Sequence, residues 1–258
     1  MIRLLKYSLL SFLLISVMGF MAEEKKIRVY LVGDSTMSVK AEKAFPETGW
    51  GMPFVCFFDQ SVAVDNRAMN GRSTKSFIAE NRWQPVADAL MPGDYVFIQF
   101  GHNDESKDKK ERYATPEEFK ANLARFIRET KAKQGIPVLL TPVSRRKFDA
   151  SGKALETHAE YAPLVREVAK ETGVALIDLD ASSIALFQQF GEQQSKLLFN
   201  QLAPGEHPNY PEGVTDNTHF NELGARKIAQ LVLKDIIELR LGLADHIVKP
   251  QPKKTDKK

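Results

Sequence analysis

The fold of this chain is decided by residues 27–36, which read IRVYLVGDST. A nearly continuous apolar run, rich in β-branched and aromatic side chains, ends at Gly33 and is followed by polar residues. Short apolar runs without alternation are typical of strands that are covered on both faces of a parallel sheet. The stretch therefore predicts a central strand, with Asp34, Ser35 and Thr36 just beyond its carboxyl end.

Runs of the same kind recur along the chain, over residues 95–100, 137–142, 174–179 and, more weakly, 61–65. Amphipathic stretches between and after them predict helices over residues 117–134, 157–171, 182–199 and 222–241. The first of these helices opens with Thr115-Pro116-Glu117-Glu118, a capping box with proline at the first helical position. The alternation predicts one doubly wound α/β domain with a central parallel sheet of about five strands.

The two ends of the chain are expected to lie outside this domain. Residues 1–22 start with Arg3 and Lys6 and continue as an apolar run, which is shorter than the roughly 20 residues of a membrane span. They predict a cleavable signal peptide and an exported protein, periplasmic or extracellular, with no stable membrane insertion after cleavage. An uncleaved anchor is the alternative. The folded domain is expected over residues 23–245, and a flexible basic tail over 246–258.

The net charge of +3 comes from the ends of the chain. Arg3 and Lys6 lie in the leader and five lysines lie from Lys249 onward, so the body between them is slightly acidic. No basic helix interleaved with aromatic residues is present, which argues against a nucleic-acid partner. Cys56 is the only cysteine, so no intramolecular disulfide is expected, and its apolar setting predicts a buried, inert thiol. The sequence leaves the oligomeric state open.

Polar clusters follow three of the predicted strands, and a fourth cluster precedes the last helix. They are Gly33-Asp34-Ser35-Thr36, Asn70-Gly71-Arg72-Ser73, Gly101-His102-Asn103-Asp104 and Asp216-Asn217-Thr218-His219. The last cluster is expected in a loop. Because ligands of open α/β sheets bind at the carboxyl ends of the strands, we expect all four clusters to converge at one edge.

These residue types supply the parts of an acyl-transfer site. Ser35 Oγ would attack a carbonyl carbon, His219 would act as general base and then as acid, and Asp216 would orient the imidazole. A tetrahedral oxyanion needs preorganised hydrogen-bond donors. The candidates are the backbone N–H groups of Ser35 and Gly71 and the side-chain amide of Asn103.

In order and spacing, the four clusters resemble the four blocks of the SGNH (GDSL-type) hydrolases. Thr36, the Asn70–Ser73 segment and the segment over 141–146 most resemble the branch that contains the rhamnogalacturonan acetylesterases. The resemblance runs from about residue 27 to residue 241. It implies a flavodoxin-like three-layer α/β/α sandwich and metal-free ester hydrolysis without a cofactor. It also implies the triad Ser35–His219–Asp216, with Ser35, Gly71 and Asn103 as oxyanion donors. Thr36 is a departure from the broader superfamily, where many relatives have leucine.

The resemblance suggests that the substrate is an acetylated plant cell-wall polysaccharide, such as rhamnogalacturonan, a pectin. Arg72, Arg145 and Arg146 could face uronate carboxylates, because guanidinium matches carboxylate geometry. Trp50 and Trp83 could stack on sugar rings. The alternative is that the arginines form structural ion pairs and that the tryptophans pack in the core.

Several other functions remain as alternatives. The same site could deacetylate xylan, other glycans or small acyl esters. A non-catalytic glycan- or nucleotide-binding α/β module is disfavoured, because no glycine-rich phosphate motif occurs and Ser35, His219 and Asn103 are all present. A metal hydrolase built on Asp216, His219 and Glu222 is disfavoured because only one nitrogen ligand is available. The α/β-hydrolases require G-x-S-x-G, which the serine segment lacks.

Overall fold

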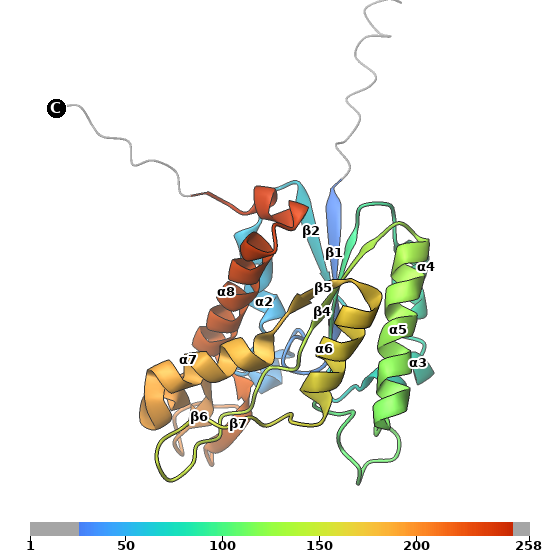
Figure 1. Cartoon of the computed structure of the whole chain (residues 1–258). Helices are drawn as coiled ribbons and strands as arrows, with labels where there is room; N and C mark the ends of the chain where they lie inside the picture. Colours follow the sequence, from blue (N-terminus) through green and yellow to red (C-terminus); the bar gives the residue numbers. More distant parts are fainter. Residues whose placement is uncertain (1–25, 250–258) are drawn as a thin grey trace, which may run out of the picture.

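The computed structural model describes residues 26–249 and contains a five-stranded parallel sheet in the order β2-β1-β3-β4-β5 (Figure 1). Its strands are β1 (Ile27–Gly33), β2 (Val62–Asn66), β3 (Tyr95–Gln99), β4 (Ile136–Leu140) and β5 (Ala175–Ile177). All five lie where the apolar runs predict them. The prediction of a parallel sheet in an α/β fold is therefore confirmed.

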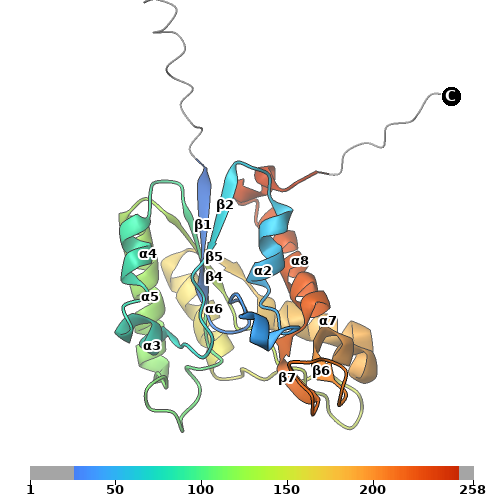
Figure 2. The same ribbon diagram turned by 180° about the vertical axis from the view of Figure 1, so that it is seen from behind.

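The sheet is covered on both faces because its strands alternate buried side chains between two cores. Val29 and Leu31 of β1 belong to one core, whereas Tyr30 and Val32 belong to the other. The first core is closed by α2 (Gly51–Phe54), α7 (Leu179–Gln194) and α8 (Glu222–Glu238). The second is closed by α3 (Thr74–Ala79), α4 (Gln84–Ala89), α5 (Pro116–Ala132) and α6 (Tyr161–Thr172). Figure 2 shows the resulting three layers from behind, and the predicted α/β/α sandwich is confirmed.

Local sequence signals explain where the longer helices begin. Thr115 Oγ1 accepts a hydrogen bond from the Glu118 N–H, and the Glu118 carboxylate accepts one from the Thr115 N–H, so the predicted capping box of α5 is present. Helix α8 begins after Asn221, whose side chain accepts from the Gly224 N–H. This start matters for the site, because it follows His219 by only three residues.

The prediction of a helix over residues 182–199 is wrong at its carboxyl end. Helix α7 stops at Gln194, and a second, two-stranded antiparallel sheet pairs β6 (Phe199–Leu202) with β7 (Val214–Phe220). The rings of Phe199 and Phe220 pack 5.0 Å apart and bury the base of this hairpin. Asp216 and His219 consequently lie on a strand, not in the loop that the sequence predicts.

The carboxyl-terminal end of the domain and the setting of Cys56 also differ from expectation. Ile247 bridges to Phe58 and the Val248 N–H donates to the Phe57 carbonyl, so the packed domain extends beyond residue 245. Cys56 is exposed, so the expectation of a buried thiol is wrong. The predicted signal peptide and most of the tail lie outside the described residues. None of the helices in the described part of the chain has the length and apolar character that crossing a bilayer requires.

Candidate active site

Ser35 lies in a tight turn just past the carboxyl end of β1. Asp34 Oδ1 accepts from the Thr36 N–H over 2.9 Å and from Thr36 Oγ1 over 2.8 Å, which braces the turn. Gly33 permits a close approach to β3, since a Cβ there would stand 2.6 Å from the Gln99 carbonyl oxygen. The turn presents the Ser35 side chain at the edge of the sheet.

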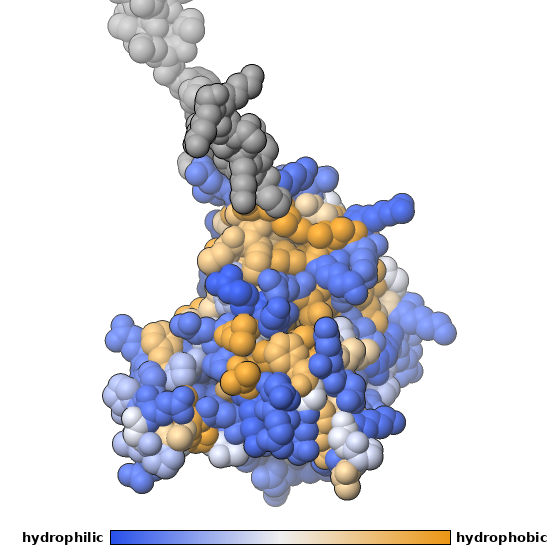
Figure 3. Space-filling view, turned by 90° about the vertical axis from the view of Figure 1, so that its left-hand side faces the viewer, coloured by the Kyte–Doolittle hydropathy of each residue, from blue (hydrophilic) through white to orange (hydrophobic). Residues whose placement is uncertain are grey.

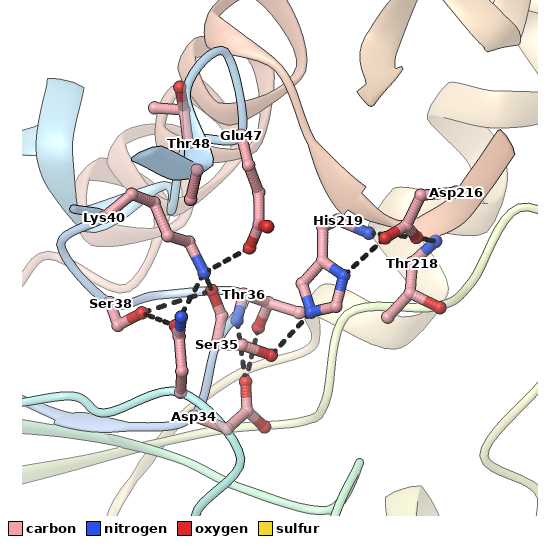
Figure 4. Close-up of polar contacts among 12 residues, drawn as sticks. Asp34, Ser35, Thr36, Ser38, Lys40, Glu47, Thr48, Asp216, Thr218 and His219 are labelled. Atoms are coloured by element: carbon pink, nitrogen blue, oxygen red, sulfur yellow. Dashed lines mark hydrogen bonds and ion pairs between the residues drawn. The ribbon is translucent and has the colours of Figure 1, made fainter. Parts of the chain in front are cut away.

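The side chains of Ser35, His219 and Asp216 form one hydrogen-bonded chain (Figure 4). His219 Nε2 lies 2.9 Å from Ser35 Oγ, and His219 Nδ1 lies 2.7 Å from Asp216 Oδ2. With Nδ1–H donating to the carboxylate, Nε2 is left to accept the proton of Ser35. This is the arrangement by which a serine hydroxyl is activated as a nucleophile.

The Asp216 carboxylate is held by the backbone N–H groups of the residues that follow it. Asp216 Oδ1 accepts from the N–H groups of Thr218 over 2.7 Å and of His219 over 2.9 Å. This turn within β7 brings the carboxylate onto the ring three residues later. Partial burial opposes ionisation, but the hydrogen bonds from His219 and Thr218 outweigh it and lower the pKa of Asp216 below its ordinary value. The carboxylate is therefore ionised beside the imidazole.

The backbone N–H groups of Ser35 and Gly71 are oriented through the carbonyl groups of the same peptide units, which are held by hydrogen bonds. The Asp34 carbonyl accepts from the N–H groups of Met37 and Ser38, and the Asn70 carbonyl accepts from Arg72 Nη1 over 2.9 Å. In a trans peptide the N–H points away from the C=O. Within residues 26–249, the Ser35 and Gly71 amides donate no hydrogen bond, so both remain available to an oxyanion.

The side-chain amide of Asn103 is held at both ends. Its Oδ1 accepts from Arg112 Nη1 over 2.8 Å, and its Nδ2 donates to the Arg72 carbonyl over 3.0 Å. These contacts leave the second Nδ2 hydrogen unused. Arg112 is a site residue that sequence reasoning missed, because it follows the charged run over 105–111 and carries no signal that separates it from a solvated surface charge.

The structure places the predicted substrate-binding tryptophans in the core and the predicted substrate-binding arginines at the surface. Trp50 is wholly buried and its Nε1 donates to Gln99 Oε1 over 2.7 Å, so the prediction that it stacks on a sugar ring is wrong. Trp83 is 1% exposed and its Nε1 donates to Glu129 Oε2, so the same prediction is wrong for Trp83. Arg72 and Arg145 keep about a third of their side chains exposed, but each is paired, with Glu80 at 3.0 Å and with Glu105 at 2.7 Å.

Further titratable groups lie in the interior behind the site, among them Asp104 and His102. Asp104 Oδ1 accepts from the Thr74 N–H and Oγ1, and burial raises the pKa of Asp104 to about 7. Burial lowers the pKa of His102 well below its ordinary value, and its ring packs edge-on against His158. Across residues 26–249, no group of three or more His, Cys, Asp or Glu side chains is placed to hold a metal ion.

A hollow of about 710 Å³ lies beside the amino-terminal end of α8. It is lined by Phe45, Pro46, Thr48, Met52, Pro53, His207, Glu222, Leu223 and Arg226. In the described part of the chain Arg226 has no ion-pair partner, and its guanidinium lies 6.0 Å from the Phe57 ring centroid. Figure 3 views the side of the molecule on which α7 and α8 lie in Figure 1, and it shows apolar patches set among hydrophilic residues.

Comparison with known proteins gives consistent similarities. Residues 31–227 match the GDSL-like lipase/acylhydrolase family. The chain is 43% identical over 230 residues to the rhamnogalacturonan acetylesterase RhgT of Bacillus subtilis (strain 168), covering 89% of this chain and 98% of that protein. It is 37% identical to the probable rhamnogalacturonan acetylesterase YesY of the same strain, covering 86% and 97%. The crystal structure of Bacillus subtilis YxiM superimposes with a TM-score of 0.72 at 26% identity, covering 84% of this chain and 58% of that one.

Proposed function

The chain belongs to the GDSL-like lipase/acylhydrolase family, and from that premise we propose that it is a serine esterase that removes O-acetyl groups from rhamnogalacturonan. The observation that carries the proposal is the contact of 2.9 Å between Ser35 Oγ and His219 Nε2, with Asp216 on the other ring nitrogen.

In the first half-reaction, Ser35 Oγ attacks the acetyl carbonyl carbon and its proton passes to His219 Nε2. The carbonyl oxygen becomes an oxyanion, which accepts hydrogen bonds from the N–H groups of Ser35 and Gly71 and from Asn103 Nδ2. Asp216 stabilises the imidazolium. When the tetrahedral intermediate collapses, the bond to the sugar oxygen breaks. His219 protonates that oxygen, the sugar hydroxyl departs, and the acetyl group remains on Ser35.

In the second half-reaction, a water molecule gives a proton to His219 Nε2 and attacks the acetyl-enzyme. The same three donors stabilise the second oxyanion. Its collapse breaks the bond to Ser35 Oγ, which takes the proton back from His219, and acetic acid leaves and ionises to acetate in solution. Each proton that His219 accepts is returned, so the site is restored after one turnover.

Two observations support a polysaccharide substrate. RhgT and YesY, whose names describe rhamnogalacturonan acetylesterases, match this chain over nearly their whole lengths. The hollow beside α8 offers apolar surface together with Arg226, which could pair with the carboxylate of a uronate residue. Such a polymer does not enter a cell, so we also propose that the protein is exported and that residues 1–22 are the signal.

The substrate assignment is tested by measuring acetate release from acetylated rhamnogalacturonan, acetylated xylan and 4-nitrophenyl acetate, with Ser35→Ala as the blank. We expect the highest kcat/KM among the polymers on rhamnogalacturonan, and no change when EDTA is added. A preference for xylan would contradict the assignment of the polymer but not the assignment of an esterase.

A further inference from the structure

The side chain of Lys40 ends in a buried ammonium group directly behind the Ser35 turn (Figure 4). Its side chain is 0% exposed, and Nζ donates to three oxygens: the Ser35 carbonyl at 2.5 Å, Asn70 Oδ1 at 2.7 Å and a Glu47 carboxylate oxygen at 2.6 Å. An ammonium has three hydrogens. Every donor of Lys40 is therefore used on a protein acceptor.

The three acceptors belong to three segments that meet at the site. The Ser35 carbonyl is part of the nucleophile's own residue, and Asn70 precedes Gly71, whose N–H is the second oxyanion donor. Glu47 is followed by Thr48, whose N–H donates to the Phe220 carbonyl over 2.8 Å, next to His219 on β7. One cation thus ties together the nucleophile turn, the Gly71 segment and the histidine strand.

Burial of a charged lysine opposes folding unless the charge is fully compensated. Burial lowers the pKa of Lys40, whereas Glu47, with smaller contributions from Asp34 and Asp216, acts to keep it protonated. A buried ion pair is weak evidence for a role in stability, because apolar replacements are often equally stable. The positions of its acceptors point instead to a role in the geometry of the site.

We propose that Lys40 is a positioning residue of the esterase, which sets the spacing between the Ser35 and Gly71 oxyanion donors by holding the Ser35 carbonyl and the Asn70 side chain on one ammonium. Ser38 supports the same link, because its Oγ donates to Asn70 Oδ1 over 2.5 Å. The proposal rests on the function proposed above, since it concerns the donors that stabilise the oxyanion.

The test replaces Lys40 by methionine, which keeps most of the unbranched apolar side chain and removes the ammonium. We expect kcat for 4-nitrophenyl acetate to fall by about 100-fold, the loss associated with a displacement of about 1 Å in an active site, while KM changes by less than about threefold. Inhibition by phenylboronic acid, which forms a tetrahedral adduct on the serine, should weaken in parallel with kcat/KM. Lys120→Met is the matched control, because Lys120 pairs with Glu167 and Glu171 on the outer helices, and its activity should be unchanged.

A Lys40→Met variant that melts like the wild type and keeps kcat within about threefold would overturn the proposal. If that variant does not fold, Glu47→Gln decides. It preserves an acceptor for Lys40 but removes the charge that keeps Lys40 protonated. Because the proposal requires the ammonium, kcat should fall at alkaline pH as Lys40 loses its proton, and in Glu47→Gln this fall should occur at lower pH than in the wild type. A pH profile of kcat that does not move would overturn the proposal. Ser35→Ala distinguishes a failure of the Lys40 proposal from a failure of the proposed function. Equal activity of that variant and the wild type would overturn the esterase function itself.

Discussion

Arg112 donates a hydrogen bond to Asn103 Oδ1 over 2.8 Å, and this contact determines which way the Asn103 amide faces. A free asparagine side chain can present either its oxygen or its nitrogen to an oxyanion, but only the nitrogen stabilises negative charge. Arg112 occupies the oxygen and the Arg72 carbonyl occupies one N–H. The remaining N–H is the one that the proposed chemistry requires.

We therefore expect Arg112→Met to lower kcat on 4-nitrophenyl acetate by about tenfold, less than the 100- to 1,000-fold associated with removing a donor altogether. A double-mutant cycle with Asn103→Ala checks the mechanism. In the Asn103→Ala background, loss of Arg112 should have little further effect. Fully additive losses would contradict the proposed role of Arg112. Arg125→Met, which breaks an ion pair with Glu129 on α5, is the control.

The stability of the protein should depend on the protonation of Asp104. Burial raises the pKa of this carboxyl from 3.8 to about 7, so the folded state binds the proton more tightly than the unfolded state does. The resulting stabilisation is fully present below the unfolded pKa and is lost as the pH rises through about 7. From the size of the pKa shift, the loss is about 4 kcal/mol at most.

Asp104→Asn tests this dependence, because the amide stays neutral while its oxygen can still accept from the Thr74 N–H and Oγ1. In urea unfolding at about pH 5 and about pH 8, the wild type should lose more of its free energy of unfolding than the variant does. If the two proteins lose the same amount, Asp104 does not titrate as its burial indicates.

Arg226 should contribute to binding of an acidic polymer but not to the chemistry. Arg226 lines the hollow and has no ion-pair partner among residues 26–249. Arg226→Gln is therefore expected to raise KM for acetylated rhamnogalacturonan by about tenfold or more, because a hydrogen bond to a charged group contributes about 1.5–3 kcal/mol. The rate with neutral 4-nitrophenyl acetate should not change. Arg145→Gln is the comparison, because the Arg145 guanidinium is already paired with Glu105 and its loss should affect KM less. Equal losses on both substrates would argue against a uronate contact at Arg226.

The fold could be predicted from the sequence where a buried strand is a continuous apolar run or where a helix begins with a recognisable capping sequence. The buried strands β1, β3 and β4 are nearly continuous apolar runs, and the capping box at Thr115 marks the start of α5. The β6–β7 hairpin could not be predicted, because Phe199–Leu202 is too short and too polar to give a strand signal and the pairing depends on contacts with Phe220.

The candidate site likewise contains residues that the sequence predicts and residues that it does not. Ser35, Gly71, Asn103, Asp216 and His219 were predicted because each lies in a polar cluster in the expected order, and the structure places them at one edge of the sheet.

Lys40 and Arg112 could not be predicted, because a lysine or arginine in a loop is usually solvated and only the tertiary structure shows what it holds. The sequence also suggests sugar stacking for Trp50, because a tryptophan can serve as a stacking surface, and only the tertiary structure shows that this one is buried.

The most direct test of the central claim is acetate release from 4-nitrophenyl acetate and acetylated rhamnogalacturonan by the purified protein, comparing the wild type with Ser35→Ala. We predict that the wild type releases acetate in the presence of EDTA and that Ser35→Ala loses at least about 1,000-fold in kcat, because nucleophile and base act as one unit. Equal rates for the two proteins would show that Ser35 is not the nucleophile and would contradict the account.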